Sequence, residues 1–181
     1  MREKEVCGLK WDYEVKVPEL DTSVFIIPGD RVKNGEERLV VLNAVAKSVV
    51  DSVRGLHPVN VFIRAHKKVG ELRPLTKMYN TAWKAARERA ADAWAEQHCE
   101  TAPAGFRKIR VHDLKHTFGR RLRAAGVSFE DRQDLLGHRS GRITTHYSQA
   151  ELASLIEAAE RVCATESRKS PATTWLRRKS G

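Results

Sequence analysis

The alternation of apolar and polar positions divides the chain into a β-rich beginning and a mainly helical remainder. Residues 15–17, 23–27 and 38–42 are short runs rich in β-branched and aromatic side chains, which is typical of strands. Turn signals separate the last two runs at Pro28-Gly29-Asp30 and at Asn34-Gly35. We therefore expect a small three-stranded antiparallel sheet near the N-terminus.

Longer segments with apolar residues at helical spacing follow this sheet. Asn43 and Ser128 are suitable caps at helix starts, and Gly126 and Gly137 are stop signals. The basic residues, glycine and proline within 64–75 favour a surface loop there. After the end of a short helix in residues 2–11, the predicted helices span residues 43–54, 76–99, 111–125, 129–136, 140–147 and 149–163. The predicted fold class is therefore mixed α/β and mainly α-helical.

Composition indicates a globular chain with a polyanionic partner. The 181 residues are 41% hydrophobic and 31% charged, which is enough for one domain with a sizeable core. The net charge of +10 favours nucleic acid first and an anionic membrane surface second, and a basic surface that serves only solubility is the alternative. A run of 18 apolar residues is absent from the sequence, so we expect no membrane-spanning helix.

Cysteine usage fits a protein of the reducing cytoplasm. Cys7, Cys99 and Cys163 are odd in number and far apart, which argues against a disulfide framework and against a zinc site. We expect them to be buried thiols. The first residues carry charge but lack the apolar core of a signal peptide.

The last third of the chain contains the residues best suited to chemistry. His112 and Lys115 are three residues apart, so one helical face presents both. His138 follows a Leu-Leu-Gly turn, and Tyr147 comes nine residues later. A tyrosine phenolate attacks phosphorus when cations and hydrogen-bond donors surround the phosphate oxygens. The alternative for Tyr147 is a ring that packs in the core with its hydroxyl hydrogen-bonded.

These segments, taken in order, resemble the C-terminal catalytic domain of tyrosine recombinases, the phage integrase family. His112 and Lys115 match the family's His-x-x-Arg pattern with lysine in place of arginine. His138 matches the later histidine and Tyr147 the nucleophile. The first residues resemble its Arg-x-x-Glu-x-x-x-Leu-x-Trp segment, which begins here at Arg2.

The resemblance implies a DNA strand-exchange reaction through a 3′-phosphotyrosyl intermediate. Arg2, Lys115 and His138 would hold the phosphate oxygens, and His112 would assist proton transfer. Lys33, in the turn between two predicted strands, would protonate the leaving 5′ oxygen. For Arg2 and Lys115 the alternative is a solvated side chain, and for Lys33 a hairpin lysine that aids solubility. His116 is four residues from His112, but a third ligand for a metal does not accompany this pair.

The resemblance also implies the partners and the extent of the domain. Residues 1–164 would form the catalytic domain without its first helices and its N-terminal DNA-binding domain, and residues 165–181 a basic tail. The expected partners are double-stranded DNA and further protomers in a tetramer, with no metal or nucleotide cofactor, in a bacterial or phage-encoded protein. The expected DNA-contacting residues are Arg31, Lys67, Lys68, Lys77, Arg110 and Arg139. A catalytically inactive DNA-binding remnant and a type IB topoisomerase-like relaxing enzyme remain as alternatives.

Overall fold

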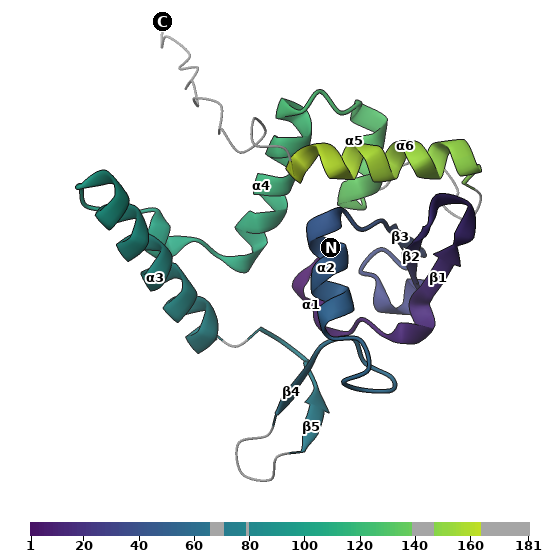
Figure 1. Ribbon diagram of the computed structural model, residues 1–181, viewed down its shortest axis with the longest axis horizontal. Coiled ribbons are helices and arrows are strands. Elements are labelled where there is room, and N and C mark those ends of the chain that lie inside the picture. The colour runs from purple at the N-terminus through teal and green to yellow at the C-terminus, as the bar shows by residue number, and fades with distance from the viewer. Residues whose placement is uncertain (66–70, 79, 139–146, 164–181) are drawn as a thin grey trace, which may run out of the picture.

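The computed structural model describes residues 1–65, 71–78, 80–138 and 147–163, and its elements are arranged as in Figure 1. The α-helices are α1 Glu3–Cys7, α2 Ala44–Ser52, α3 Asn80–His98, α4 Val111–Ala124, α5 Phe129–Leu136 and α6 Gln149–Glu160. The strands are β1 Glu14–Val17, β2 Thr22–Ile27, β3 Arg38–Val40, β4 Ile63–Ala65 and β5 Leu72–Pro74. The mixed α/β class predicted from the sequence is therefore confirmed.

Strands β1, β2 and β3 form an antiparallel sheet in that order. Phe25 of β2 is paired with Glu14 of β1 on one side and with Val40 of β3 on the other. Along β2, Phe25 and Ile27 are buried and Ile26 between them is exposed, which is the period-two pattern of a strand face turned to a core. Val24 is buried as well, so the other face of β2 is covered at that position.

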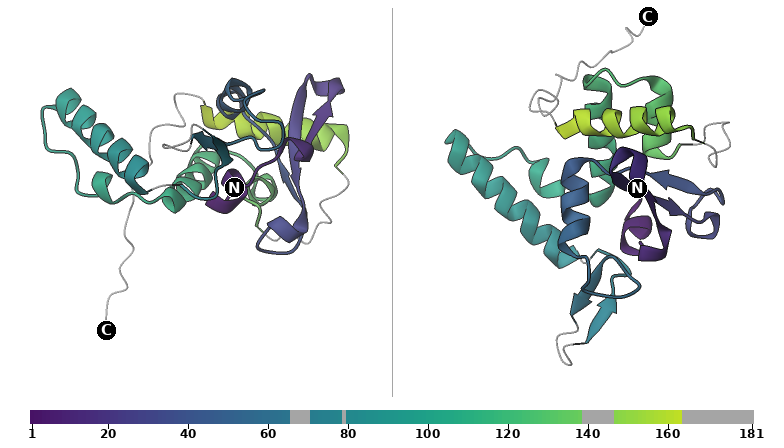
Figure 2. Two further views of the ribbon diagram at one scale, coloured as in Figure 1. Left: turned by 90° about the horizontal axis from the view of Figure 1, so that it is seen from below. Right: turned by 45° about the vertical axis from the view of Figure 1, so that its right-hand side comes forward.

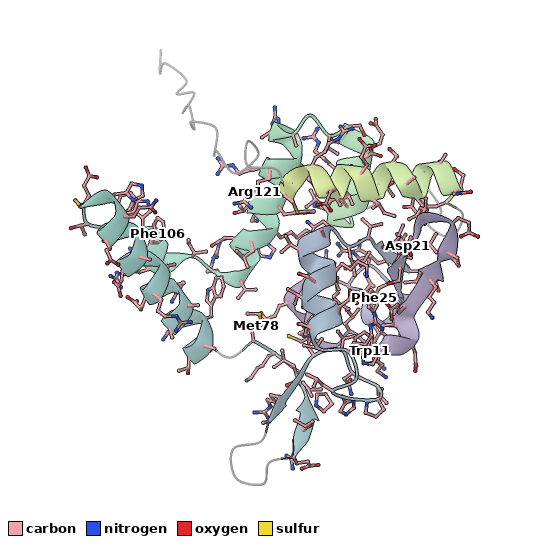
Figure 3. The ribbon with its side chains drawn as sticks, viewed as in Figure 1. Trp11, Asp21, Phe25, Met78, Phe106 and Arg121 are labelled. Atoms are coloured by element: carbon pink, nitrogen blue, oxygen red, sulfur yellow. The ribbon has the colours of Figure 1, made fainter. Side chains whose placement is uncertain are left out.

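Helix α2 and the sheet enclose the first of two hydrophobic cores. The side chain of Phe25 lies among those that fill the space between α2 and the sheet (Figure 3). Asn43 caps α2 as predicted, because its Oδ1 accepts a hydrogen bond from Ala46 N at 2.9 Å. The buried members of this core are Leu9, Phe25, Ile27, Val32, Val50 and Val61.

Helices α4, α5 and α6 enclose the second core, around the fully buried Leu122. Helix α6 lies across α4 and α5 in the views of Figures 1 and 2. Both predicted stop signals end a helix, since Gly126 and Gly137 adopt φ values of +70° and +59°. Ser128 caps α5 as expected, its Oγ accepting from Asp131 N at 3.0 Å. The end of α5 lies beside β3, since Arg38 Nη2 donates to Leu135 O.

Within the segment 64–75, which was predicted to be a surface loop, the described residues 64–65 and 72–74 lie in strands instead. Strands β4 and β5 make a second antiparallel sheet, in which Arg64 pairs with Arg73 and Ile63 with Pro74. The hairpin projects from the rest of the fold (Figure 1). Proline is tolerated in β5 because an edge strand does not need every N–H in its ladder. The basic residues and the proline made these two strands, of three residues each, difficult to recognise from the sequence.

Two further expectations need correction. Tyr147 was expected inside a helix over residues 140–147, but it lies outside any helix, and residues 139–146 are outside the described ranges. Its successor Ser148 is the N-cap of α6 instead. The three cysteines are free, yet only Cys7 is buried, whereas Cys99 is exposed in a left-handed conformation after α3. Position at a helix end, rather than residue type, decides the exposure of Cys99.

Among the described residues, no helix combines the length and the apolar character that crossing a bilayer requires.

Candidate functional site

A cleft of roughly 1180 Å³ lies where α1, β3, the start of α4 and the end of α5 meet. Its lining comes from segments that are far apart in the sequence. The six residues predicted to be catalytic all contribute to this lining: Arg2, Lys33, His112, Lys115, His138 and Tyr147. The packing of the two cores therefore brings these six residues, which are far apart in the sequence, to one cleft.

Glu5 organises the floor of this cleft by binding two arginines. The Arg2 backbone N–H donates to Glu5 Oε2 at 2.7 Å, and Arg2 Nη1 donates to Oε1 at 3.2 Å. Arg38 Nη1 donates to Oε2 at 2.7 Å. Burial alone would raise the pKa of Glu5, but the N–H of Arg2 and the charge of Arg38 outweigh it and hold that pKa below its usual value. Glu5 is thus a carboxylate at neutral pH.

We predict that Glu5→Gln lowers the free energy of unfolding by about 3–5 kcal/mol at pH 7, because it leaves the buried Arg38 without its counter-charge. Since the native pKa of Glu5 is lowered, its stabilising contribution is present above the ordinary carboxyl pKa and is lost as pH falls through the native value. Denaturant unfolding of the parent chain and of Glu5→Gln at pH 7 and at pH 3 measures this contribution. The difference between their free energies of unfolding is expected to be smaller at pH 3.

The matched control is Glu71→Gln, which breaks the pair of exposed side chains Glu71 and Arg73. It costs only about 0–1 kcal/mol, as surface ion pairs do. Equal losses in Glu5→Gln and Glu71→Gln would contradict the assignment of a buried, charged Glu5.

Lys115 and His138 also line this cleft. Burial, followed by the charges of Arg38 and Arg2, lowers the pKa of Lys115. Partial burial, then the charge of Lys115 and that of Arg38, lowers the pKa of His138. Burial is the main cause of both shifts, and the charges of Arg38 and Arg2 add to it. The positive charge that Arg2, Arg38 and Lys115 place around Glu5 favours an anion in this part of the cleft.

His112 stands in the first turn of α4, where backbone N–H groups and the helix dipole also favour an anion. The side chain is exposed, and its ring lies edge-on to the ring of His116, with 4.9 Å between centroids. Within the described ranges, His, Cys, Asp and Glu side chains nowhere gather in a group of three. The rings of His112 and His116 pack against each other along one face of α4.

Lys33 and Tyr147 approach the cleft from segments without regular structure. Lys33 is exposed in the turn between β2 and β3, close to Gly35 with its φ of +75°. Tyr147 is half-buried immediately before Ser148. Ser148 begins α6 with a capping box, in which its N–H donates to Glu151 Oε2 at 2.8 Å. The capping box fixes where α6 begins and hence where Tyr147 leaves it.

The residues predicted to contact DNA have different surroundings. Arg31 is exposed and paired with the exposed Asp30 at 3.1 Å, and Lys77 is exposed. Arg110 is the N-cap of α4 and forms an ion pair with Asp113 at 3.0 Å. The other three members of the set, Lys67, Lys68 and Arg139, lie outside the described residues.

Sequence reasoning missed Arg38, the only arginine among the buried described residues. Its side chain is 6% exposed, and Arg38 Nη2 donates to Leu135 O at 3.5 Å besides the bond to Glu5. Arg38 is paired in register with the buried Ile27 of β2. A charged residue in the inward phase of a strand was the signal that could have revealed it.

Comparison with protein-family models matches residues 1–153 to the model described as Phage integrase family. The matched range contains all six predicted catalytic residues and most of the chain. The comparisons with curated proteins and with solved structures gave no significant match.

Proposed function

Because the chain belongs to the phage integrase family, we propose that it cleaves and rejoins double-stranded DNA through a 3′-phosphotyrosyl intermediate. One observation carries this proposal. Side chains from Arg2 to Tyr147 line a single cleft, and within it Arg2, Arg38 and Lys115 place a cluster of positive charge around the Glu5 carboxylate. Such a cleft suits a phosphodiester, whose charge grows on the non-bridging oxygens during attack.

The proposed reaction forms one bond as it breaks another. The Tyr147 oxygen attacks the scissile phosphorus, a phosphorus–tyrosine bond forms, and the bond to the 5′ oxygen breaks. Lys33 gives the 5′ oxygen its proton, and His112 assists removal of the phenolic proton. Rejoining is the reverse, so the covalent link conserves the energy of the phosphodiester and no nucleotide is consumed.

The phosphate oxygens are held by Arg2, Lys115 and His138 in this proposal. Arg2 supplies a guanidinium already oriented by Glu5. Lys115 stands where the family pattern has arginine, and contributes a point charge in place of a planar fork. The partial burial that lowers the pKa of Lys115 also strengthens its attraction for a phosphate that replaces water.

Binding to duplex DNA is expected to weaken steeply with salt. With Z phosphate contacts, log K falls with log salt at a slope of about −0.9Z, because bound cations release counterions. Titration of a labelled duplex at several salt concentrations measures the slope. Arg31→Ala and Lys77→Ala are each expected to reduce it by about one contact. An affinity that does not change with salt would contradict a DNA partner.

The decisive experiment is trapping of a covalent complex on a duplex with a nick beside the scissile phosphate. The short strand released after cleavage diffuses away, so the adduct accumulates and is detected on a denaturing gel. An adduct supports the proposal. DNA binding without an adduct would instead identify an inactive DNA-binding module, and the proposed reaction would be wrong.

Assembly distinguishes recombination from relaxation. We propose that four protomers act on two duplexes, since strand exchange joins ends from two sites. Sedimentation on DNA that carries two sites, and recombination of two such duplexes, test this. Relaxation of supercoiled DNA by single protomers, without exchange between sites, would favour a topoisomerase-like enzyme.

A further inference from the structure

The buried Arg38 is not among the residues to which the proposed reaction gives a task. Its side chain is only 6% exposed, so little of it faces the cleft that it helps to line. Burying a guanidinium is costly, and an apolar side chain of similar volume often serves stability as well or better. Its bonds therefore need an explanation other than stability.

One set of bonds connects Arg38 to Arg2. Glu5 Oε2 accepts from Arg38 Nη1 and from the Arg2 backbone N–H, both at 2.7 Å. Glu5 Oε1 remains for Arg2 Nη1 at 3.2 Å. Arg38 thus holds the carboxylate by the oxygen that also accepts from the Arg2 N–H, and the orientation of the Arg2 side chain depends on where Glu5 is held.

A second set of contacts connects Arg38 to the turn that carries His138. Arg38 Nη2 donates to Leu135 O in the last turn of α5. The guanidinium also lies directly against Gly137, where an added Cβ would be 2.6 Å from Arg38 Nε. Gly137 has a φ of +59°, and the next residue is His138, whose N–H bonds Gln133 O at 2.9 Å. The backbone that leads into His138 therefore packs against the Arg38 guanidinium.

We propose that Arg38 is a positioning residue that orients Arg2, through Glu5, and the His138 turn, through Leu135 and Gly137, on the same phosphate. This inference rests on the proposed function, and it deepens it by joining two phosphate-holding groups from opposite ends of the chain. The charge of Arg38 also contributes to the lowered pKa values of Lys115 and His138, which agrees with its place behind the anion site.

The test compares two glycines that each end a helix with positive φ. Gly126 has a φ of +70° and open space around an added Cβ, so Gly126→Ala reports the backbone strain alone. Gly137→Ala adds a collision with Arg38 to a similar strain. Both variants keep Arg38, and their thermal unfolding shows whether each is folded and how stable it is. The activity readout is the single-turnover rate of adduct formation on the nicked duplex at saturating protein, with DNA affinity measured separately.

We expect Gly126→Ala to cleave within about threefold of the parent chain, because it changes no contact at the site. Gly137→Ala is expected to cleave about a hundredfold slower with little change in DNA affinity, as a displaced binding group misplaces the reacting phosphate. Arg38→Lys keeps the charge and loses the planar fork, so we expect it to slow cleavage by about tenfold or more.

The double variant Arg38→Lys with Gly137→Ala decides whether the effect passes through Arg38. If it does, Gly137→Ala slows cleavage in the Arg38→Lys background no more than Gly126→Ala slows it in the parent chain. Equal rates for Gly137→Ala and Gly126→Ala, or independent effects at positions 38 and 137, would overturn the inference. If Arg38→Lys does not fold, the two glycine variants decide alone. A parent chain that forms no adduct would overturn the proposed function, and with it this inference.

Discussion

Tyr147→Phe abolishes the covalent protein–DNA adduct and leaves DNA affinity nearly unchanged. Only the hydroxyl oxygen forms the bond to phosphorus, and its removal leaves the ring in its half-buried position before α6. Loss of a nucleophile that has no substitute lowers the rate by at least about a thousandfold. Denaturing gels of the nicked-duplex reaction measure the adduct, and titration of the labelled duplex measures affinity.

Tyr13→Phe is the matched control for this experiment. Tyr13 is partly buried against the first core and does not line the cleft. It loses the same hydroxyl group, and adduct formation is expected to continue at the parent rate. An adduct formed by Tyr147→Phe would assign the nucleophile to another residue.

Lys115→Ala has the second largest expected effect, a fall in the cleavage rate of about a hundredfold to a thousandfold. The substitution removes a cation that Arg38 and Arg2 surround in the cleft, and so weakens the stabilisation of charge in the transition state. Lys115→Arg is expected to retain or exceed the parent rate, because the planar fork binds two phosphate oxygens at once. Lys84→Ala, on the exposed surface of α3, is the control and leaves the rate unchanged.

The pH profile gives an independent measure of Lys115. The ammonium form holds the phosphate, so the rate is high below the pKa of Lys115 and falls as pH rises through it. Burial and the neighbouring arginines lower that pKa, so the decline begins at a lower pH than an ordinary lysine would give. In Lys115→Arg the part of the alkaline decline that comes from Lys115 disappears, since arginine stays charged. A collapse of cleavage in Lys115→Arg together with an active Lys115→Ala would exclude Lys115 from the phosphate site.

Much of the local structure was predictable because its causes are local. Asn43 and Ser128 cap the helices that follow them, and Gly126 and Gly137 end the helices before them. Caps and left-handed glycines act within a few residues, so the sequence contains their whole cause. The hairpin of β4 and β5 was missed because a strand pair of three residues a side gains its stability from cross-strand bonds and neighbours, which no local pattern records.

The sequence by itself also determined which side chains are chemically suited to a phosphate, through the order of His112, Lys115, His138 and Tyr147. Only the tertiary structure decided that they share one cleft with Arg2 and Lys33, because the packing of two separate cores brings these segments together. Burial of Arg38 was decided in the same way. Its ion pair with Glu5 spans 33 residues and its hydrogen bond to Leu135 O spans 97, and contacts over such separations depend on the whole fold rather than on neighbours in sequence.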